Sequence, residues 1–218
     1  MNSKELIACR VAQEFKNGEM VNLGAGIPNL AVKYIKEGVK IYLQAENGIV
    51  GCGPHDPSKP IDLFSTDAGE NPVSIIPGGA IVDSCTSFGL IRGRHLSTSV
   101  LGAMQVDIEG NLANWMVPGG KIAGMGGAMD LVCGAKRVIA TMEHCTKDGS
   151  PKILKRCTYP LTGQKVVSMI ITELSVFMVT PQGLVLTETA PGVSVQEIRQ
   201  KTEASFEVSS DLQEMVLN

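Results

Sequence analysis

The sequence is poor in aromatic residues, in long hydrophobic runs and in clustered positive charge. Its 218 residues include five Phe, three Tyr and one Trp. The longest apolar stretches, such as residues 166–171, fall far short of the ~20 residues that a membrane-spanning helix needs. The 19 basic residues are outnumbered by 22 acidic ones and form no long run, which is unlike a nucleic-acid-binding surface. We therefore expect neither a membrane span nor a nucleic-acid partner.

Motifs for metal binding and export are also missing. The six cysteines are widely separated and include no CxxC pair, and His55, His95 and His144 are too scattered to form a ligand set. The N-terminal residues carry an acid and a base and no apolar segment of the kind found in signal peptides. We expect free thiols, no metal site and a cytoplasmic location.

Glycine, in contrast, is abundant, with 24 residues against an average usage of roughly 7%. Hydrophobic residues make up 44% of the chain, enough to form a packed core. No linker, low-complexity tract or internal repeat interrupts the sequence. We expect one domain, over residues 1–218, rich in tight turns and close backbone approaches.

Hydrophobic periodicity predicts alternating helices and strands. An N-terminal helix begins at Asn2 or Ser3, with Glu5 completing a capping box, and ends at Asn17 and Gly18. Further helices are expected at residues 28–38, 82–91, 128–135 and 194–201. Strands are expected at 20–23, 41–44, 74–76, 99–106, 112–117, 137–142, 175–180 and 184–187, and a surface loop at 51–60.

This order predicts an α/β fold, with a mainly parallel open sheet flanked by helices and some antiparallel hairpins. Ligands of such sheets bind beyond the carboxyl ends of the strands. Gly24 and Gly26 lie at one such end, but Asn29 replaces the third glycine of a dinucleotide fingerprint, so a plain tight turn is favoured there.

Two other loops hold candidate chemistry. Glu46 lies between a predicted strand and an Asn-Gly turn, where it is either a solvated turn residue or a carboxylate held still for nucleophilic catalysis. Residues 119–130 contain five glycines just before a helix. Their free N–H groups form either an anion cradle or a flexible turn.

Taken together, these loops resemble a known family. Residues 43–51 match the strand-end motif L-Q-S-E-N-G-φ-φ-G of the β subunit of two-subunit family I CoA-transferases, the acetate/butyrate–acetoacetate and 3-oxoacid type, except that Ala45 replaces serine. Residues 21–28 resemble the family's V-N-L-G-x-G-φ-P element. Similar stretches occur at 90–93, 101–107, 111–115 and 124–131, so that the resemblance runs from about residue 7 to about residue 207.

The resemblance implies a mechanism that needs no prosthetic group, with coenzyme A as a substrate. Glu46 would be the nucleophile, forming first an acyl-glutamyl anhydride and then a glutamyl-CoA thioester in a ping-pong reaction. Gly127 would supply an oxyanion-binding N–H, and Asn22 would orient the carboxylate. The expected binding residues are Asn22, Gly24, Gly26, Asn47 and Gly126.

The resemblance further implies a partner, because an α subunit of similar fold completes the active site, usually as an α2β2 assembly. Acetoacetate with butyrate or acetate fits best, in short-chain fatty acid or ketone body metabolism, although succinate and 3-oxoadipate users share these motifs. An acyl-CoA hydrolase and a non-catalytic CoA-binding domain are the alternatives. The effect of Ala45 on acyl preference or rate stays open.

Overall fold

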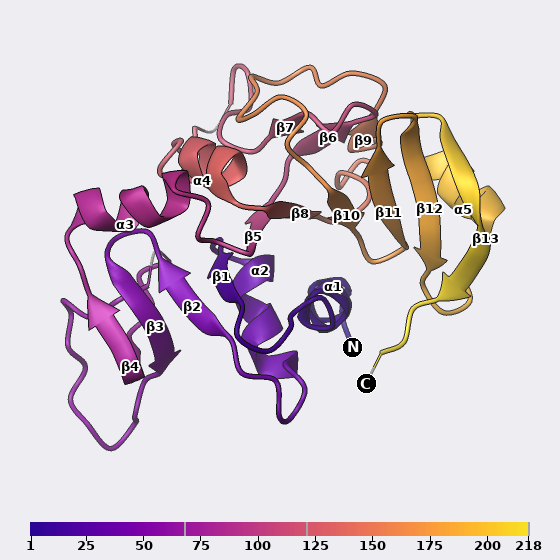
Figure 1. Cartoon of the computed structure of the whole chain (residues 1–218). Helices are drawn as coiled ribbons and strands as arrows, with labels where there is room; N and C mark the ends of the chain where they lie inside the picture. Colours follow the sequence, from indigo (N-terminus) through magenta and orange to yellow (C-terminus); the bar gives the residue numbers. More distant parts are fainter. Residues whose placement is uncertain (68, 121, 218) are drawn as a thin grey trace.

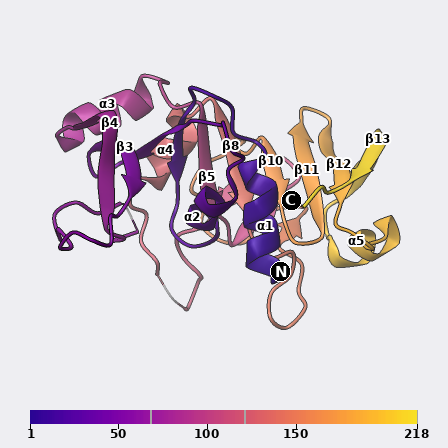
Figure 2. The same ribbon diagram turned by 90° about the horizontal axis from the view of Figure 1, so that it is seen from below.

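A ten-stranded sheet crosses the whole molecule (Figures 1 and 2). The computed structural model describes residues 1–67, 69–120 and 122–217. The strand order is β13-β12-β11-β10-β8-β5-β1-β2-β3-β4. The strands are β1 (Met20–Leu23), β2 (Tyr42–Ala45), β3 (Ile49–Pro54), β4 (Val73–Ile81), β5 (Thr98–Gly102), β8 (Arg137–Thr141), β10 (Met169–Ile171), β11 (Ser175–Thr180), β12 (Gly183–Thr189) and β13 (Phe206–Glu214).

The centre of this sheet is parallel and its flanks are mixed. Strands β2, β1, β5, β8 and β10 run parallel to one another, whereas β3 and β4 continue the sheet on one side as antiparallel neighbours. On the other side β11 and β12 form an antiparallel hairpin, and β13 returns parallel to β12. The α/β class with a parallel centre and antiparallel hairpins is thereby confirmed.

Within the described ranges, a three-stranded sheet and six helical segments surround the main sheet. The small sheet has the order β7-β6-β9 and consists of β6 (Gln105–Asp107), β7 (Leu112–Ala113) and β9 (Ile153–Leu154). The helices are α1 (Ser3–Ala12), α2 (Ile27–Leu30), the 3-10 helix η1 (Ala31–Tyr34), α3 (Ser84–Arg92), α4 (Ala128–Gly134) and α5 (Val195–Lys201). Among the described residues, no helix is long and apolar enough to cross a membrane.

Several predicted boundaries are wrong. The strand expected at 99–106 is two strands, because β5 ends at Gly102 and β6 pairs in the small sheet instead. The expected loop at 51–60 begins with four residues of β3, and the strand expected at 74–76 extends over the whole of β4. Strand β4 includes Pro77, which is tolerated because β4 lies at the edge of the sheet and needs fewer backbone donors.

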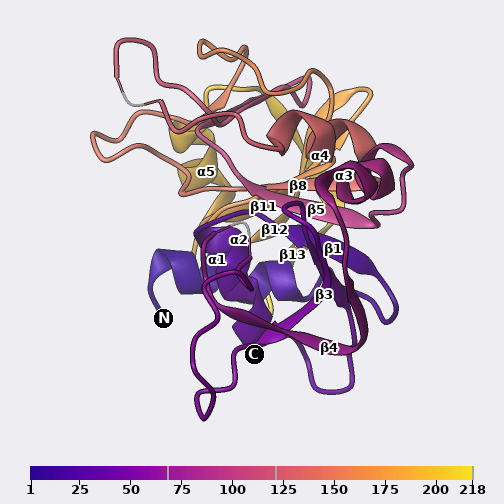
Figure 3. The ribbon, with the colours of Figure 1, turned by 90° about the vertical axis from the view of Figure 1, so that its left-hand side faces the viewer.

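The sheet separates two hydrophobic cores. Helices α1 and α2 cover one face, and α3, α4, α5 and the small sheet cover the other (Figure 3). Strand β8 shows the division, because Val138 and Ala140 belong to one core and Ile139 to the other. This alternation is the period of two expected of a strand covered on both faces.

Helix α1 begins with the predicted capping box. The Asn2 side chain accepts a hydrogen bond from the Glu5 N–H at 3.0 Å, and the Asn2 N–H donates to the Glu5 carboxylate at 2.9 Å. Both contacts satisfy N–H groups that have no partner inside the helix. The start of the helix is therefore set by local chemistry.

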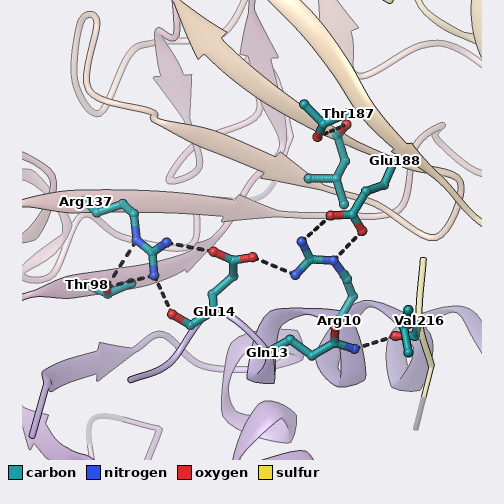
Figure 4. Close-up of polar contacts among 9 residues, drawn as sticks. Arg10, Gln13, Glu14, Thr98, Arg137, Thr187, Glu188 and Val216 are labelled. Atoms are coloured by element: carbon teal, nitrogen blue, oxygen red, sulfur yellow. Dashed lines mark hydrogen bonds and ion pairs between the residues drawn. The ribbon is translucent and has the colours of Figure 1, made fainter. Parts of the chain in front are cut away.

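A chain of ion pairs then fixes α1 against the sheet (Figure 4). The buried Arg10 guanidinium binds Glu14 at 2.7 Å and donates from Nε to Glu188 of β12 at 2.6 Å. The other carboxylate oxygen of Glu14 lies 2.7 Å from Nη1 of Arg137 in β8. One glutamate therefore joins two guanidinium groups from different elements, which fixes the helix on the sheet face.

Candidate active site

Glu46 follows the last residue of β2, at the turn into β3. The turn is held by the Gly48 N–H, which donates to Ala45 O at 3.0 Å, and by the Val82 N–H, which donates to Gly48 O at 2.8 Å. Gly48 has a φ of +126°, and a β-carbon there would lie 2.3 Å from Val82 O. Only glycine fits this position, so the backbone that carries Glu46 has little freedom.

A buried amide contacts the Glu46 carboxylate from the neighbouring strand β1. Nδ2 of Asn22 lies 3.2 Å from Oε2 of Glu46, 2.9 Å from the carbonyl oxygen of Gln44 and 3.0 Å from Oε1 of Gln44. Asn22 is only 1% exposed. Asn22 thus contacts the residue that the resemblance predicts it to orient, and its role stays a prediction.

Sequence reasoning missed two members of this polar chain. Nε2 of the buried Gln44 donates to Oγ of Ser87 at 2.8 Å, which links β2 to helix α3. Both side chains are buried and hydrogen-bonded, as polar groups in a core must be. A signal was present, since Gln44 is a polar residue in an otherwise apolar predicted strand.

Gly127 brings the backbone of a distant loop against Glu46. It precedes α4, and a β-carbon on it would lie 3.1 Å from Cγ of Glu46 and 3.2 Å from Cζ of Phe88. Both contacts are tighter than ordinary van der Waals packing. Residue 121 of the same glycine-rich loop, Lys121, lies outside the described residues.

Most of the predicted site residues line one cavity of about 650 Å³ above the carboxyl ends of β1, β2, β5 and β8. Its wall includes Asn22, Gly24, Gly26, Glu46, Gly126 and Gly127. Asn47 does not line it, since its exposed side chain donates to Thr66 O at 2.8 Å and so holds the segment after β3. The cavity is placed as ligand sites usually are in open α/β sheets.

The two cavity glycines after β1 have different surroundings. The Gly24 N–H donates to Val100 O at 2.8 Å, and a β-carbon on Gly24 would lie 3.2 Å from Cδ2 of Leu101. Gly26 has a φ of +85° and open space around the position of its missing side chain. Side chains at either position would narrow the cavity or strain the turn.

Ala45 faces away from this cavity. It is 4% exposed and packs with Ile49 and Cys52, at the wall of a second cavity of about 390 Å³. Burial raises the pKa of the Cys52 thiol to about 11, so that it stays protonated at neutral pH. A serine side chain at position 45 would lie at the wall of this second cavity.

No group of three or more His, Cys, Asp or Glu side chains with metal-binding geometry occurs in the part of the chain that the structure describes. All six cysteines are free thiols. Around Glu46 the wall of the cavity presents a carboxylate, the Asn22 amide and the backbone of several glycines. Such a set suits acyl transfer through a covalent glutamyl intermediate.

The fold and this carboxylate cavity define a CoA-transferase-like α/β protein. The family model described as "Coenzyme A transferase" matches residues 4–201. The chain therefore belongs to the coenzyme A transferase family, as the sequence motifs indicated.

Two curated relatives agree with this assignment. The chain is 53% identical over 212 residues to the acetate CoA-transferase subunit beta of Escherichia coli (strain K12), covering 97% of each chain. It is 51% identical over 215 residues to the mitochondrial succinyl-CoA:3-ketoacid coenzyme A transferase 2B of Mus musculus, covering 98% of this chain and 41% of that protein. A CoA-transferase β-subunit function is thereby supported, and the subunit name implies an α-subunit partner.

A solved structure supports the fold. The acyl-CoA transferase of Escherichia coli O157:H7, described as a thioester complex with CoA, has a TM-score of 0.80 and 25% sequence identity, over 99% of this chain and 43% of that one. The chain thus corresponds to less than half of that enzyme.

Proposed function

We propose that this chain carries the nucleophile of a short-chain CoA-transferase and that Glu46 is that nucleophile. The observation that carries the proposal is the placement of Glu46: the Asn22 amide lies 3.2 Å from one carboxylate oxygen, and a β-carbon on Gly127 would lie 3.1 Å from Cγ. The thioester complex of the 25% identical acyl-CoA transferase supports a covalent CoA intermediate in this fold.

In the first half-reaction, an oxygen of Glu46 attacks the carbonyl carbon of acyl-CoA and the carbon–sulfur bond breaks. The products are an acyl-glutamyl anhydride and CoA thiolate. The thiolate then attacks the glutamyl carbonyl carbon, which releases the first acid and leaves a glutamyl-CoA thioester. A second carboxylate reverses these steps, so that the CoA leaves on the new acid and Glu46 is regenerated.

Each attack places negative charge on a carbonyl oxygen. A backbone N–H aimed at that oxygen contributes on the order of 10²–10³ in rate. The N–H of Gly127 is the proposed donor, because the place of its missing side chain lies within 3.1 Å of Cγ of Glu46. Gly24, Gly26 and Gly126 leave space for the acyl and pantetheine parts of the substrate, since they line the same cavity without side chains.

Acetoacetate, with acetate or butyrate as the second acid, is the proposed substrate pair. The names of the relatives support acetate and a 3-oxoacid, at 53% and 51% identity. The cavity wall supplies apolar side chains such as Ile27, Met104 and Met125 beside the glycines. These suit the short apolar chain of an acyl group.

The proposed partner is an α subunit in an α2β2 assembly, docked on the face beside Glu46. Strand β4, at the edge of the sheet, has no buried residue, and in the segment before it Leu63 is 80% and Phe64 96% exposed. Asn47 anchors this segment next to Glu46 through Thr66. Exposed apolar side chains beside the reactive carboxylate are typical of a surface that binds another protein. A subunit bound there would exclude water from the site.

The test is the exchange of CoA between acetyl-CoA and acetoacetate by the complex of this chain with its α subunit, comparing wild type with Glu46→Gln. We expect the variant to assemble and to lose transfer. Borohydride applied after acetyl-CoA should trap wild type at Glu46 and leave the variant unmodified. Substantial transfer by the variant contradicts the assignment, and acid release without an acceptor identifies a hydrolase.

A further inference from the structure

The cavity that contains Glu46 extends along the sheet to a lysine. Beyond β1 its wall continues over the ends of β5 and β8 to Glu143 and Lys152. Strands β2, β1, β5 and β8 are consecutive neighbours, so three strand spacings of about 4.8 Å, roughly 14 Å, separate the ends of β2 and β8. Glu46 follows β2, and Lys152 is hydrogen-bonded to His144, which follows β8, so the two residues line the cavity at strand ends that are roughly 14 Å apart.

The backbone around Lys152 is well fixed. Its N–H donates to His144 O at 3.2 Å, and its C=O accepts from the Val106 N–H at 3.1 Å. Strand β9 begins at the next residue and pairs with β6. Lys152 thus projects from an anchored segment between the two sheets and not from a free loop.

The ammonium of Lys152 lacks a close anionic partner. Among residues 1–67, 69–120 and 122–217 it takes part in no ion pair within 4.0 Å and in no side-chain hydrogen bond. Burial lowers its pKa, while the more distant charges of Glu143 and Glu173 act in the opposite direction. The Glu173 carboxylate already accepts the His144 N–H at 2.9 Å.

A half-buried cation without a partner is costly, because it has lost part of its hydration and gained no hydrogen bond in return. Such a group at a cavity wall is suited to an anionic ligand that supplies the missing contact. Glu143 is exposed and stays outside ion-pair distance, so its charge offsets that of Lys152 only from a distance.

We propose that Lys152 binds an oxyanion of the substrate at the end of the cavity opposite Glu46. This inference rests on the proposed function, because it assumes that the reacting carbonyl lies at Glu46. Two parts of the substrates present this chemistry: a phosphate of CoA, which the extended pantetheine arm separates from the thiol, and the second carboxylate of a diacid. Lys152 would be a binding and specificity residue and would take no part in the covalent steps.

The experiment compares Lys152→Met and Lys152→Arg with wild type, all as complexes with the α subunit. Lys147→Met serves as a control, because Lys147 is an exposed lysine in the loop just before Lys152. Calorimetry measures the Kd of free CoA and of succinate, and kinetics measure the KM of acetyl-CoA and succinyl-CoA. Melting temperatures within the error of wild type show that the variants are folded.

We expect Lys152→Met to raise at least one of these Kd or KM values tenfold or more, as the loss of a charged hydrogen bond does. Lys152→Arg should restore most of the affinity. Lys147→Met should change none of the values. A rise for CoA and for both CoA esters identifies a phosphate. A rise confined to succinate and succinyl-CoA identifies a carboxylate. Unchanged values for all four ligands overturn the proposal.

The two binding measurements need no turnover. If the wild-type complex binds CoA and transfers none, the proposed function fails while the calorimetric comparison still tests Lys152. If wild type transfers CoA and Lys152→Met binds and reacts like wild type, the role of Lys152 fails alone. The two failures are therefore distinguishable.

Discussion

Cγ of Glu46 lies only 3.1 Å from the place where a β-carbon on Gly127 would stand. The two residues come from loops 81 positions apart in the sequence, and the absence of a side chain at position 127 is what lets them meet. The closeness makes the backbone at Gly127 part of the carboxylate's immediate surroundings. The first prediction addresses this contact.

We predict that Gly127→Ala lowers kcat by about 10², because the added methyl displaces the Glu46 side chain and a displacement of about 1 Å costs that much. The Kd of CoA should change little. Steady-state kinetics and calorimetry on the assembled complex measure both. Gly89→Ala in α3 is the control, since a β-carbon there meets nothing within 4 Å. Equal kcat values for the two variants would contradict the prediction.

Removing the Asn22 amide, which contacts the Glu46 carboxylate, should also lower kcat. We expect Asn22→Ala to lower kcat about tenfold or more with little change in KM, because Asn22 positions Glu46 and does not need to bind CoA. Asn29→Ala removes a comparable amide, one that donates to Asp67 in the second cavity, and should leave kcat unchanged. A rise in KM alone would show that Asn22 binds substrate.

From the burial of His144 we predict that the free energy of unfolding falls in mild acid. Its imidazole is 0% exposed, with ring nitrogens 2.9 Å from the hydroxyls of Thr172 and Thr202. Burial, with a smaller contribution from the Lys201 charge, lowers the pKa of His144 from 6.5 to about 4. Between pH 6.5 and pH 4 the unfolded chain binds a proton at His144 that the folded chain does not bind. The free energy of unfolding therefore falls as the pH falls from 6.5 to about 4. Below pH 4 this group no longer changes it.

The expected loss is about 3 kcal/mol over that window. Urea unfolding of the chain at several pH values measures it. His144→Gln should be less stable at pH 7 and show a shallower dependence on pH between 6.5 and 4. His95→Gln, at an exposed position, should follow wild type. A wild-type slope in the His144 variant would disprove the assignment.

Breaking the chain of ion pairs between α1 and the sheet should strongly lower the free energy of unfolding. Glu14→Gln leaves the guanidinium groups of Arg10 and Arg137 without their shared carboxylate, and breaking a buried pair in this way costs about 3 kcal/mol. Glu109→Gln removes the same charge from an exposed pair with Lys165 at 3.7 Å and should change stability by less than about 1 kcal/mol. Urea titrations at pH 7 compare them, and similar midpoints would refute the expectation.

The exposed segment before β4 predicts a subunit contact. We expect Phe64→Ser to leave the stability of the isolated chain unchanged, since the ring is 96% exposed, and to raise the Kd for the α subunit at least about tenfold, as truncation of an aromatic anchor does. Val208→Ser on β13, at the opposite edge of the sheet, is the control. Sedimentation or light scattering reports assembly, and unchanged affinity would place the interface elsewhere.

The parts of the fold that follow from the sequence are those with local signals. The capping box at Asn2 and Glu5 and the first two strands are readable because caps and apolar periodicity are local. Strand β13 gave no such signal, since an edge strand with few buried residues need not alternate. The break between β5 and β6 was missed because only tertiary pairing decides that Gln105 joins another sheet.

The site shows the same division. Glu46 and Gly127 could be predicted to share one site because both lie in stretches that resemble family motifs. The link from Gln44 to Ser87, and the position of Lys152 at the far end of the cavity, depend on how α3 and the small sheet pack on the strands. No local pattern encodes that packing.

Strand β4 ends the sheet with an open row of backbone donors and acceptors and without a single buried residue. Such an edge can pair with any other unpaired strand it meets, including a second copy of itself. The opposite edge, β13, carries Glu207, Asp211 and Glu214, whose charges repel a like strand. We therefore expect the isolated chain to self-associate through β4 and not through β13.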